Sequence, residues 1–127
     1  MRTSLHLNGS VGRYRYAALA DPRGDLTSFE FSTLPFVPVR AFLVAGAPDA
    51  VRGGHAHVRG QQLLVRVSGE ITVEARLDGE AVSLMLDALD NAVLIKAPVW
   101  ARQTYHGVGA RLLVFSDTPF DPQAYAD

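Results

Sequence analysis

The chain has 127 residues, 48% of them hydrophobic, which is enough to build the core of one domain. Its 12 basic and 13 acidic residues leave a formal net charge of -1, which argues against a general nucleic-acid binder or a membrane-surface protein. Cysteine is absent, so disulfides, thiolate metal sites and cysteine nucleophiles are excluded. No apolar run approaches the ~18 residues of a membrane-spanning helix, and the first residues lack the apolar core of a signal peptide. We expect a soluble, cytoplasmic protein.

Apolar residues follow the period of β-strands along most of the chain. The predicted strands cover residues 26–31, 39–46, 62–69, 91–98 and 110–117, together with a hairpin over 70–87 that turns at Asp78–Gly79. Only the last residues, "DPQAYAD", allow a short helical turn. Many short strands separated by turn residues predict a single all-β domain, either a sandwich or a barrel.

The N-terminal residues are less clearly patterned than the rest. We expect residues 1–20 to form an arm that pairs with an edge strand of this subunit or is exchanged at a dimer interface. Residues 21–127 are then expected to form the barrel itself.

Two of the four histidines, His55 and His57, stand at the start of a predicted strand with one small residue between them. Residues i and i+2 of a strand project from the same face, so the two imidazoles are expected to point the same way. Such a pair can bind a metal with further ligands, or transfer protons, because histidine titrates near neutral pH. A surface pair without a function is the third possibility. The glycines before the pair and the apolar strand after it favour a position at the mouth of an interior.

The spacing after the histidines resembles the first cupin motif, in which H-x-H is followed by an acidic residue and then a glycine. Gln62 occupies the acidic position five residues after His57, and a glycine follows seven residues later. The second motif would lie within residues 97–107, with a further histidine ligand expected near Gln103; His106 is three positions away. Amides are weaker ligands than carboxylates for transition metals, so this incomplete set argues against a metal site.

A series of short blocks narrows the resemblance further. In chain order they are "DPRGDL" (21–26), "LPFVPVRAF" (34–42), "RGGHAH" (52–57), Gln62, "VSGEITV" (67–73), "APVW" (97–100) and "LLVFSDTPFDPQAY" (112–125). The series resembles the WxcM-like cupins, the family of the dTDP-sugar 3,4-ketoisomerases. The resemblance implies a cupin-type jelly-roll β-barrel that forms a homodimer and needs neither a metal nor another cofactor.

The resemblance also implies an activity. Known members isomerise dTDP-4-keto-6-deoxyglucose to its 3-keto isomer, in the biosynthesis of deoxysugars for surface polysaccharides or antibiotics. The chain is therefore expected to move a keto group between C4 and C3 of a dTDP-4-keto-6-deoxyhexose. This reaction removes the C3 proton, passes through an enediolate and returns a proton at C4, which suits an imidazole base. We assign His57 as the base and His55 as its partner, with a dTDP-linked keto sugar as the ligand.

Six further residues are candidates for substrate binding. Arg40 stands within an apolar strand and needs a partner, either a carboxylate of the barrel wall or the ligand. Arg52 precedes two glycines and suits either a pyrophosphate or the protein surface. Trp100 can stack on a base or a sugar, or belong to the core. The remaining candidates are Gln62, Arg102, which suits a phosphate, and Tyr105.

One expected residue is missing. Family members typically carry a tyrosine implicated in catalysis in the strand before the histidine pair, where this chain has Phe42 and Leu43. Tyr105 is a candidate replacement from another strand, whereas we expect Phe120 and Tyr125 to pack back on the barrel or on a partner chain. Two alternatives stay open: a non-catalytic or differently acting cupin that binds a sugar nucleotide or another small ligand, and a metallocupin. Sugar stereochemistry, nucleotide base and pathway do not follow from the sequence.

Overall fold

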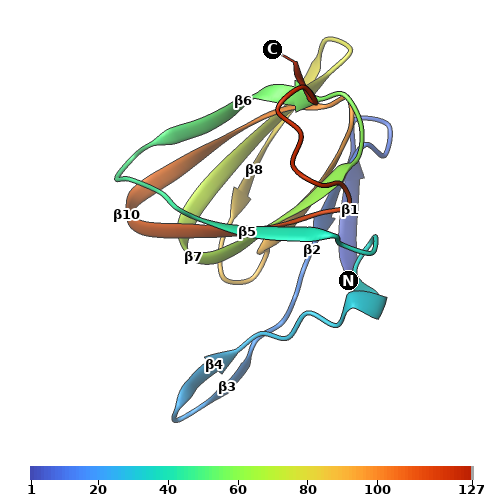
Figure 1. The fold of residues 1–127 in the computed structure, drawn as a ribbon. Coiled ribbons are helices and arrows are strands. Elements are labelled where there is room, and N and C mark those ends of the chain that lie inside the picture. Colours follow the sequence, from blue (N-terminus) through green and yellow to red (C-terminus); the bar gives the residue numbers. More distant parts are fainter. Residues whose placement is uncertain (127) are drawn as a thin grey trace.

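The computed structural model describes residues 1–126, and nearly all of its regular structure is β-strand (Figure 1). The strands are β1 (Arg2–His6), β2 (Val11–Tyr14), β3 (Leu19–Asp21), β4 (Gly24–Leu26), β5 (Arg40–Ala45), β6 (Val51–His57), β7 (Gln61–Leu77), β8 (Glu80–Leu86), β9 (Ala92–Lys96), β10 (Trp100–Ser116) and β11 (Tyr125–Ala126). A short 3₁₀ helix, η1, covers Phe31–Thr33. The prediction of a single all-β domain is confirmed. Over residues 1–126, no helix has the length and apolar character to cross a membrane.

Two long strands, β7 and β10, run through both layers of the fold. Each bends in the middle, β7 at Gly69 with φ 72° and β10 around Gly107 and Gly109 with φ 65° and 85°, a region of φ that favours glycine. The first half of each strand pairs with the second half of the other. One layer therefore has the order β1-β2-β9-β7-β10-β5, and the other has β8-β7-β10-β6-β11.

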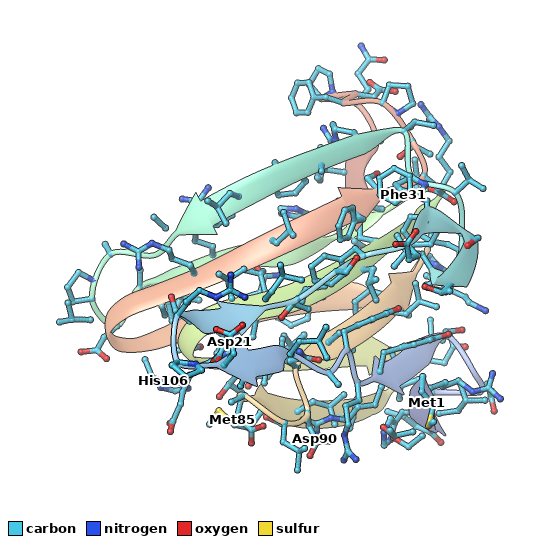
Figure 2. All side chains as sticks on the ribbon, turned by 90° about the horizontal axis from the view of Figure 1, so that it is seen from below. Met1, Asp21, Phe31, Met85, Asp90 and His106 are labelled. Carbon is cyan, nitrogen blue, oxygen red and sulfur yellow. The ribbon has the colours of Figure 1, made fainter. Side chains whose placement is uncertain are left out.

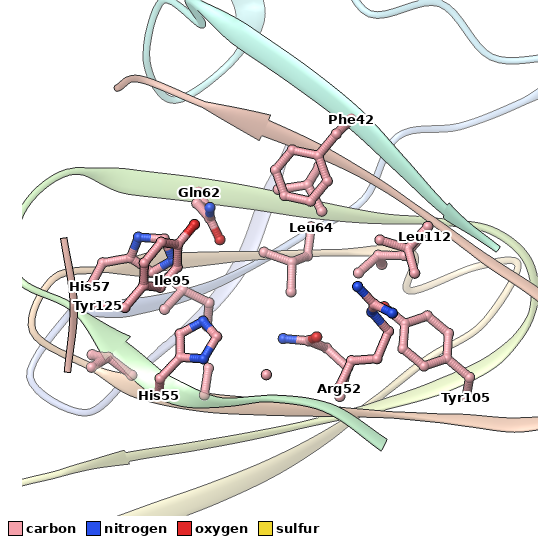
Figure 3. Close-up of a pocket in the computed structure, with 16 residues that line it drawn as sticks. Phe42, Arg52, His55, His57, Gln62, Leu64, Ile95, Tyr105, Leu112 and Tyr125 are labelled. Carbon is pink, nitrogen blue, oxygen red and sulfur yellow. The ribbon is translucent and has the colours of Figure 1, made fainter. Parts of the chain in front are cut away.

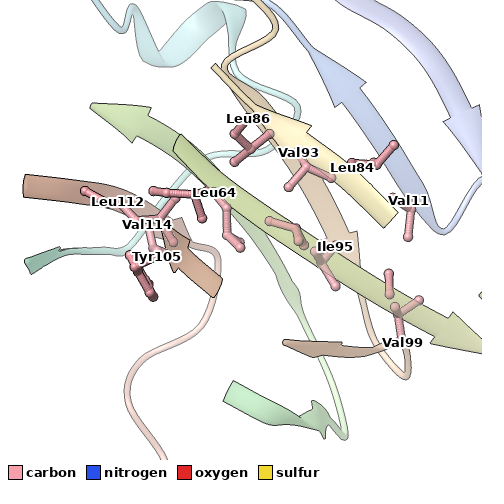
Figure 4. Close-up of a cluster of buried hydrophobic side chains, with 14 residues drawn as sticks. Val11, Leu64, Leu84, Leu86, Val93, Ile95, Val99, Tyr105, Leu112 and Val114 are labelled. Carbon is pink, nitrogen blue, oxygen red and sulfur yellow. The ribbon is translucent and has the colours of Figure 1, made fainter. Parts of the chain in front are cut away.

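The main core fills the space between these two layers. Its buried side chains come from both sides and include Leu64, Val93, Ile95, Leu112 and Val114 of one layer and Ile71, Val73, Leu84, Leu86 and Tyr105 of the other (Figure 4). A second cluster covers the outer face of the first layer, where Leu63, Val65, Leu94 and Phe115 pack against Tyr16 and Leu34. The central strands of this layer, β9 and the adjoining halves of β7 and β10, are buried on both faces, so they are continuous apolar runs in the sequence.

The N-terminal residues form two hairpins. The β1–β2 hairpin continues the first layer beside β9 of the same chain, and Val11 on β2 is fully buried in the core. The β3–β4 hairpin instead stands clear of the two layers in Figure 1, and Figure 2 shows it from below with Asp21 near its turn. Exchange of the arm with a second chain stays a prediction.

One local prediction was wrong. Residues 26–31 do not form a strand: β4 ends at Leu26, and the chain continues irregularly into η1. Phe29 of this stretch packs into the outer apolar cluster, although its backbone does not form a strand. Burial in tertiary contacts therefore explains the apolar residue there. The C-terminal segment does contain a short turn, in which the backbone N–H of Ala124 donates to the carbonyl of Asp121 at 3.1 Å, and Tyr125 and Ala126 then pair with β6 as β11. Asp127 lies outside the described residues.

Candidate active site

A pocket of about 280 Å³ opens between the two layers (Figure 3). This is near the lower end of the range for small-molecule sites, about 300–1,000 Å³. Its apolar lining comes from Phe42, Val44, Leu64, Ile95, Val99, Ala101, Leu112 and Val114, and its polar lining from Arg52, His55, His57, Gln62, Gln103, Tyr105 and Tyr125. Among the described residues, no aspartate or glutamate lines it. An apolar cavity with a few convergent polar groups is typical of a ligand site.

The glycines of β6 decide which side chains enter the pocket. Gly53 and Gly54 have φ angles of 83° and 84°, and the pairing of β6 with β10 skips Gly54, because Ala101 pairs with His55 and Arg102 with Gly53. Regular alternation would put Arg52 on the opposite face from His55, but this bulge brings both side chains into the pocket. The backbone also needs glycine for space, since a Cβ at Gly53 would lie 3.0 Å from the carbonyl oxygen of Ala101.

His55 and His57 project into the pocket together, as predicted, with ring centroids 5.9 Å apart. Burial lowers the pKa of His57 below its ordinary value of 6.5, and the nearby His55 and Arg40 lower it further. Neither imidazole has a hydrogen-bond partner among residues 1–126, so the ring nitrogens can meet a ligand. His57 is therefore largely neutral at neutral pH, which is the form that accepts a proton.

Arg40 and Arg52 are both cationic groups at the pocket without a carboxylate partner among the described residues. Arg40 lies beside the cavity, its guanidinium 5.0 Å from the ring centroid of Phe42 and 5.5 Å from that of Phe120. Its Nε atom is buried without a hydrogen-bond partner. Of the two partners considered for Arg40, a carboxylate of the barrel wall is thus absent among the described residues, and the free guanidinium groups suit an anionic ligand.

Gln62 and Tyr105 also line the pocket, as the sequence predicted for ligand-contacting residues. The ring of Tyr105 packs against Gly46, where a Cβ would lie 2.5 Å from the ring. Its hydroxyl is buried without a partner, and burial raises the pKa of this phenol, although the nearby Arg52 opposes the shift. Figure 3 shows Tyr105 beside Arg52, at the opposite end of the pocket from His57.

Two predicted ligand residues, Trp100 and Arg102, do not lie in the pocket. They share the outer face of β10, where Arg102 forms a 2.5 Å ion pair with Glu74. The guanidinium groups of Arg76 and Arg102 lie 4.5 Å and 5.6 Å from the Trp100 ring. Alternation along β10 sends Ala101, Gln103 and Tyr105 inward and these two side chains outward. The arrangement does not support contact of Trp100 or Arg102 with a ligand held in this pocket.

The pocket does not gather a set of metal ligands. Within residues 1–126, no three His, Cys, Asp or Glu side chains lie close enough together to hold a metal ion. His106 is on the outer face of β10, where its Nε2 lies 2.6 Å from the hydroxyl of Thr72. Gln62 and Gln103 occupy the pocket positions at which the cupin pattern expected an acid and a histidine.

Tyr125 is a polar pocket residue that the sequence did not predict. It was expected to pack back on the barrel, and the structure places its ring 4.6 Å from that of His55 and 4.7 Å from that of His57. No local pattern marks a strand of two residues, so only the long-range pairing of β11 with β6 reveals this neighbour.

Comparison with known proteins places the chain in a family. Residues 11–127 match the family model described as WxcM-like, C-terminal (FdtA). The chain belongs to this family. No curated protein sequence matches the WxcM-like chain significantly.

Solved structures share the fold. QdtA, a sugar 3,4-ketoisomerase from Thermoanaerobacterium thermosaccharolyticum, has 24% identity over 91% of this chain and 86% of that one, with a TM-score of 0.83. A 3,4-ketoisomerase from Helicobacter canadensis has 25% identity over 91% and 88%, with a TM-score of 0.82. WlaRB, a TDP-quinovose 3,4-ketoisomerase from Campylobacter jejuni, has 27% identity over 87% of each chain, with a TM-score of 0.78. The predicted family and cupin-type jelly-roll fold are confirmed.

Proposed function

We propose that this WxcM-like chain is a sugar-nucleotide isomerase that moves a keto group between C4 and C3 of a dTDP-4-keto-6-deoxyhexose. The similarity to sugar 3,4-ketoisomerases supports the broader class, a sugar-nucleotide isomerase or epimerase. The observation that carries the proposal is the His55–His57 pair, because two unpartnered imidazoles share one pocket with Arg52 and lie near Arg40.

The charge of the pocket favours this class of ligand. A dTDP sugar carries a pyrophosphate, and a carboxylate in the lining would repel it. The described lining has none, whereas Arg52 enters the pocket and Arg40 lies beside it. Arginine binds phosphate oxygens with two parallel hydrogen bonds, so we assign the pyrophosphate to Arg52. Arg40 lies near His57 and is placed to contact the ligand at the histidine end of the pocket. Gln62 and Tyr105 then contact the sugar or nucleoside.

The two imidazoles supply the proton transfers on carbon. Neutral His57 takes the proton from C3, and the electrons of the broken C–H bond form the enediolate. The protonated His57 returns a proton to C4, while a proton leaves O3 and another reaches O4, which completes the 3-keto product. The reaction therefore needs no external oxidant or reductant. His55, 5.9 Å away between ring centroids, contacts the same enediolate and stabilises its charge as a hydrogen-bond donor.

The proposal is tested by incubating the protein with dTDP-4-keto-6-deoxyglucose in D₂O and following the sugar by proton NMR. We expect loss of the C3 proton, deuterium at C4 and accumulation of the 3-keto isomer. His57→Asn should lower kcat by about 10²–10⁴-fold, the usual contribution of a general base, while dTDP still binds. His106→Asn is the matched control, because this histidine lies on the outer face of β10 beside Thr72.

The same measurements separate the alternatives. Tight dTDP binding without exchange in any dTDP-4-keto-6-deoxyhexose would indicate a non-catalytic binding protein. Inversion at a carbon without movement of the keto group would indicate an epimerase. Loss of activity on treatment with a chelator, restored by one added metal, would support the metallocupin.

A further inference from the structure

The C-terminal strand β11 brings a phenol to the histidine pair. In the antiparallel pairing of β11 with β6, Tyr125 lies directly opposite His57. Residues opposite one another in such a ladder project from the same face, so the Tyr125 side chain enters the pocket beside His57. His55 lies two residues before His57 on β6 and is the diagonal neighbour on that face.

The three rings form one cluster at this end of the pocket (Figure 3). The Tyr125 ring is perpendicular to that of His55, with an interplanar angle of 89° and centroids 4.6 Å apart. It is tilted by 53° to the ring of His57 at 4.7 Å. Both distances are shorter than the 5.9 Å between the imidazoles, so the phenol ring is closer to each histidine than they are to each other.

Several contacts hold the segment that carries Tyr125. The neighbouring residue, Ala124, is buried, and its carbonyl accepts a 2.7 Å hydrogen bond from the backbone N–H of Val58. Arg59 forms a 2.7 Å ion pair with Asp121. These contacts join the C-terminal segment to the residues that directly follow His57. Three contacts therefore fix Tyr125 relative to the histidines: the β11–β6 pairing, the Val58–Ala124 hydrogen bond and the Arg59–Asp121 ion pair.

The proposed isomerisation needs such a group. Two protons move on carbon, one leaving C3 and one reaching C4, and two move on oxygen, one leaving O3 and one reaching O4. As C3–H and O3–H break and C4–H and O4–H form, the carbonyl moves from C4 to C3. A phenol can donate its proton to O4 while its oxygen, or a neighbouring imidazole, receives the proton of O3. The imidazoles are then free for the transfers on carbon.

We propose that Tyr125 is this catalytic phenol, an assignment that rests on the isomerase function proposed above. No other tyrosine is placed for the role in the described structure. Tyr105 also lines the pocket, but it lies beside Arg52 at the far end (Figure 3). Phe42 lines the pocket without a hydroxyl, and Leu43 on the next position of β5 is exposed on the other face.

The test compares two substitutions that separate the hydroxyl from the ring. Tyr125→Phe keeps the ring packed on both imidazoles and removes only the hydroxyl, and Tyr125→Ala removes both. We expect Tyr125→Phe to lower kcat by about 10²-fold or more, the lower end of the range for acid–base groups, with KM and dTDP affinity within about twofold of wild type. Tyr105→Phe should instead raise KM. Tyr14→Phe is the matched control, because Tyr14 on β2 stacks on Tyr16 away from the pocket.

The outcomes are distinguishable. A wild-type protein without ketoisomerase activity overturns the proposed function and this role together. An active wild type with a Tyr125→Phe variant within threefold of its kcat overturns the role of Tyr125 alone. If only Tyr125→Ala loses activity, Tyr125 packs against the histidines without transferring protons. Thermal unfolding of each variant, together with the NMR signals of the His55 and His57 rings, shows that the fold and the ring cluster are intact.

Discussion

At the scale of single residues, the surroundings of His57 suit it to the proposed role of a base. Burial disfavours the charged imidazolium, and His55 and Arg40 repel it, so all three lower its pKa. The groups that face His57 are His55 and Tyr125 on the strands of the site and Arg40 at the start of β5. Among the described residues no carboxylate lines the pocket to oppose these effects.

This electrostatic setting predicts the pH dependence of the reaction. The base must be neutral, and its lowered pKa keeps it neutral to a pH below 6.5. We therefore expect kcat/KM to be constant around neutral pH and to fall as the pH drops through this lowered pKa. The profile is measured together with an NMR titration of the His57 ring, assigned by His57→Gln. An acid limb at or above pH 6.5 would contradict the assignment.

At the scale of elements, the bulge in β6 determines the composition of the site. A regular strand would direct His55 and His57 inward and Arg52 outward. The bulge at Gly53–Gly54 reverses the alternation once, so that a cation and two imidazoles line one pocket. The "RGGH" sequence is therefore a structural requirement of the site as well as a family signature.

Substitution of Gly53 tests this role. Gly53→Ala places a Cβ at φ 83° and 3.0 Å from the carbonyl oxygen of Ala101. The left-handed conformation alone costs about 1–2 kcal/mol in a non-glycine residue, and the contact adds to this. We expect a lower free energy of urea unfolding and, because Arg52 turns away, weaker dTDP binding.

Gly79→Ala is the control, with a φ of 81° and no atom within 4 Å of the added Cβ. This variant should lose only the stability that the left-handed backbone conformation costs a non-glycine residue, and it should bind dTDP with wild-type affinity. Equal dTDP affinity in both variants would show that the bulge does not orient Arg52 for the ligand.

At the scale of the whole molecule, the surface favours the predicted homodimer. The edge strand β5 pairs only with β10 within residues 1–126, and its outer face exposes Leu43, with Val39 just before it, at 59% and 61%. Leu19 and Leu26 of the projecting β3–β4 hairpin are also exposed, at 74% and 61%. Apolar groups gathered at a strand edge and on an unsupported hairpin favour association with a second chain.

Leu43→Asp tests this association. An aspartate on the outer face of β5 should shift the protein towards monomers in sedimentation velocity by at least tenfold in dissociation constant, because it buries a charge in an apolar interface. Val108→Asp is the control, since Val108 is 85% exposed at the bend of β10. A wild-type protein that is monomeric at micromolar concentration would refute the homodimer.

Much of the fold was predictable from local patterns. The Asp78–Gly79 turn forms with φ angles of 51° and 81°, as the hairpin required, and the strands with strong apolar patterns are present. The hairpins of residues 1–26 were not predicted, because their strands are only three to five residues long and carry no clear alternating pattern. The position of the β1–β2 hairpin also depends on β9, which pairs with β2 from far away in the sequence. The outward direction of Trp100 and Arg102 was available from the sequence, since alternation separates them from Tyr105.

The sequence by itself determined the family, because short blocks such as "RGGHAH" carry the resemblance. It also determined the all-β fold and the shared face of His55 and His57, because the period of a strand is a local property of the chain. It also located Gln62 and Tyr105 among the ligand-contacting candidates, and the structure places both in the pocket. Only the tertiary structure decided which groups surround the histidines. The pairing of β11 with β6 brings in Tyr125, and a bulge turns Arg52 inward. Both depend on the register between strands distant in sequence, which no local pattern specifies.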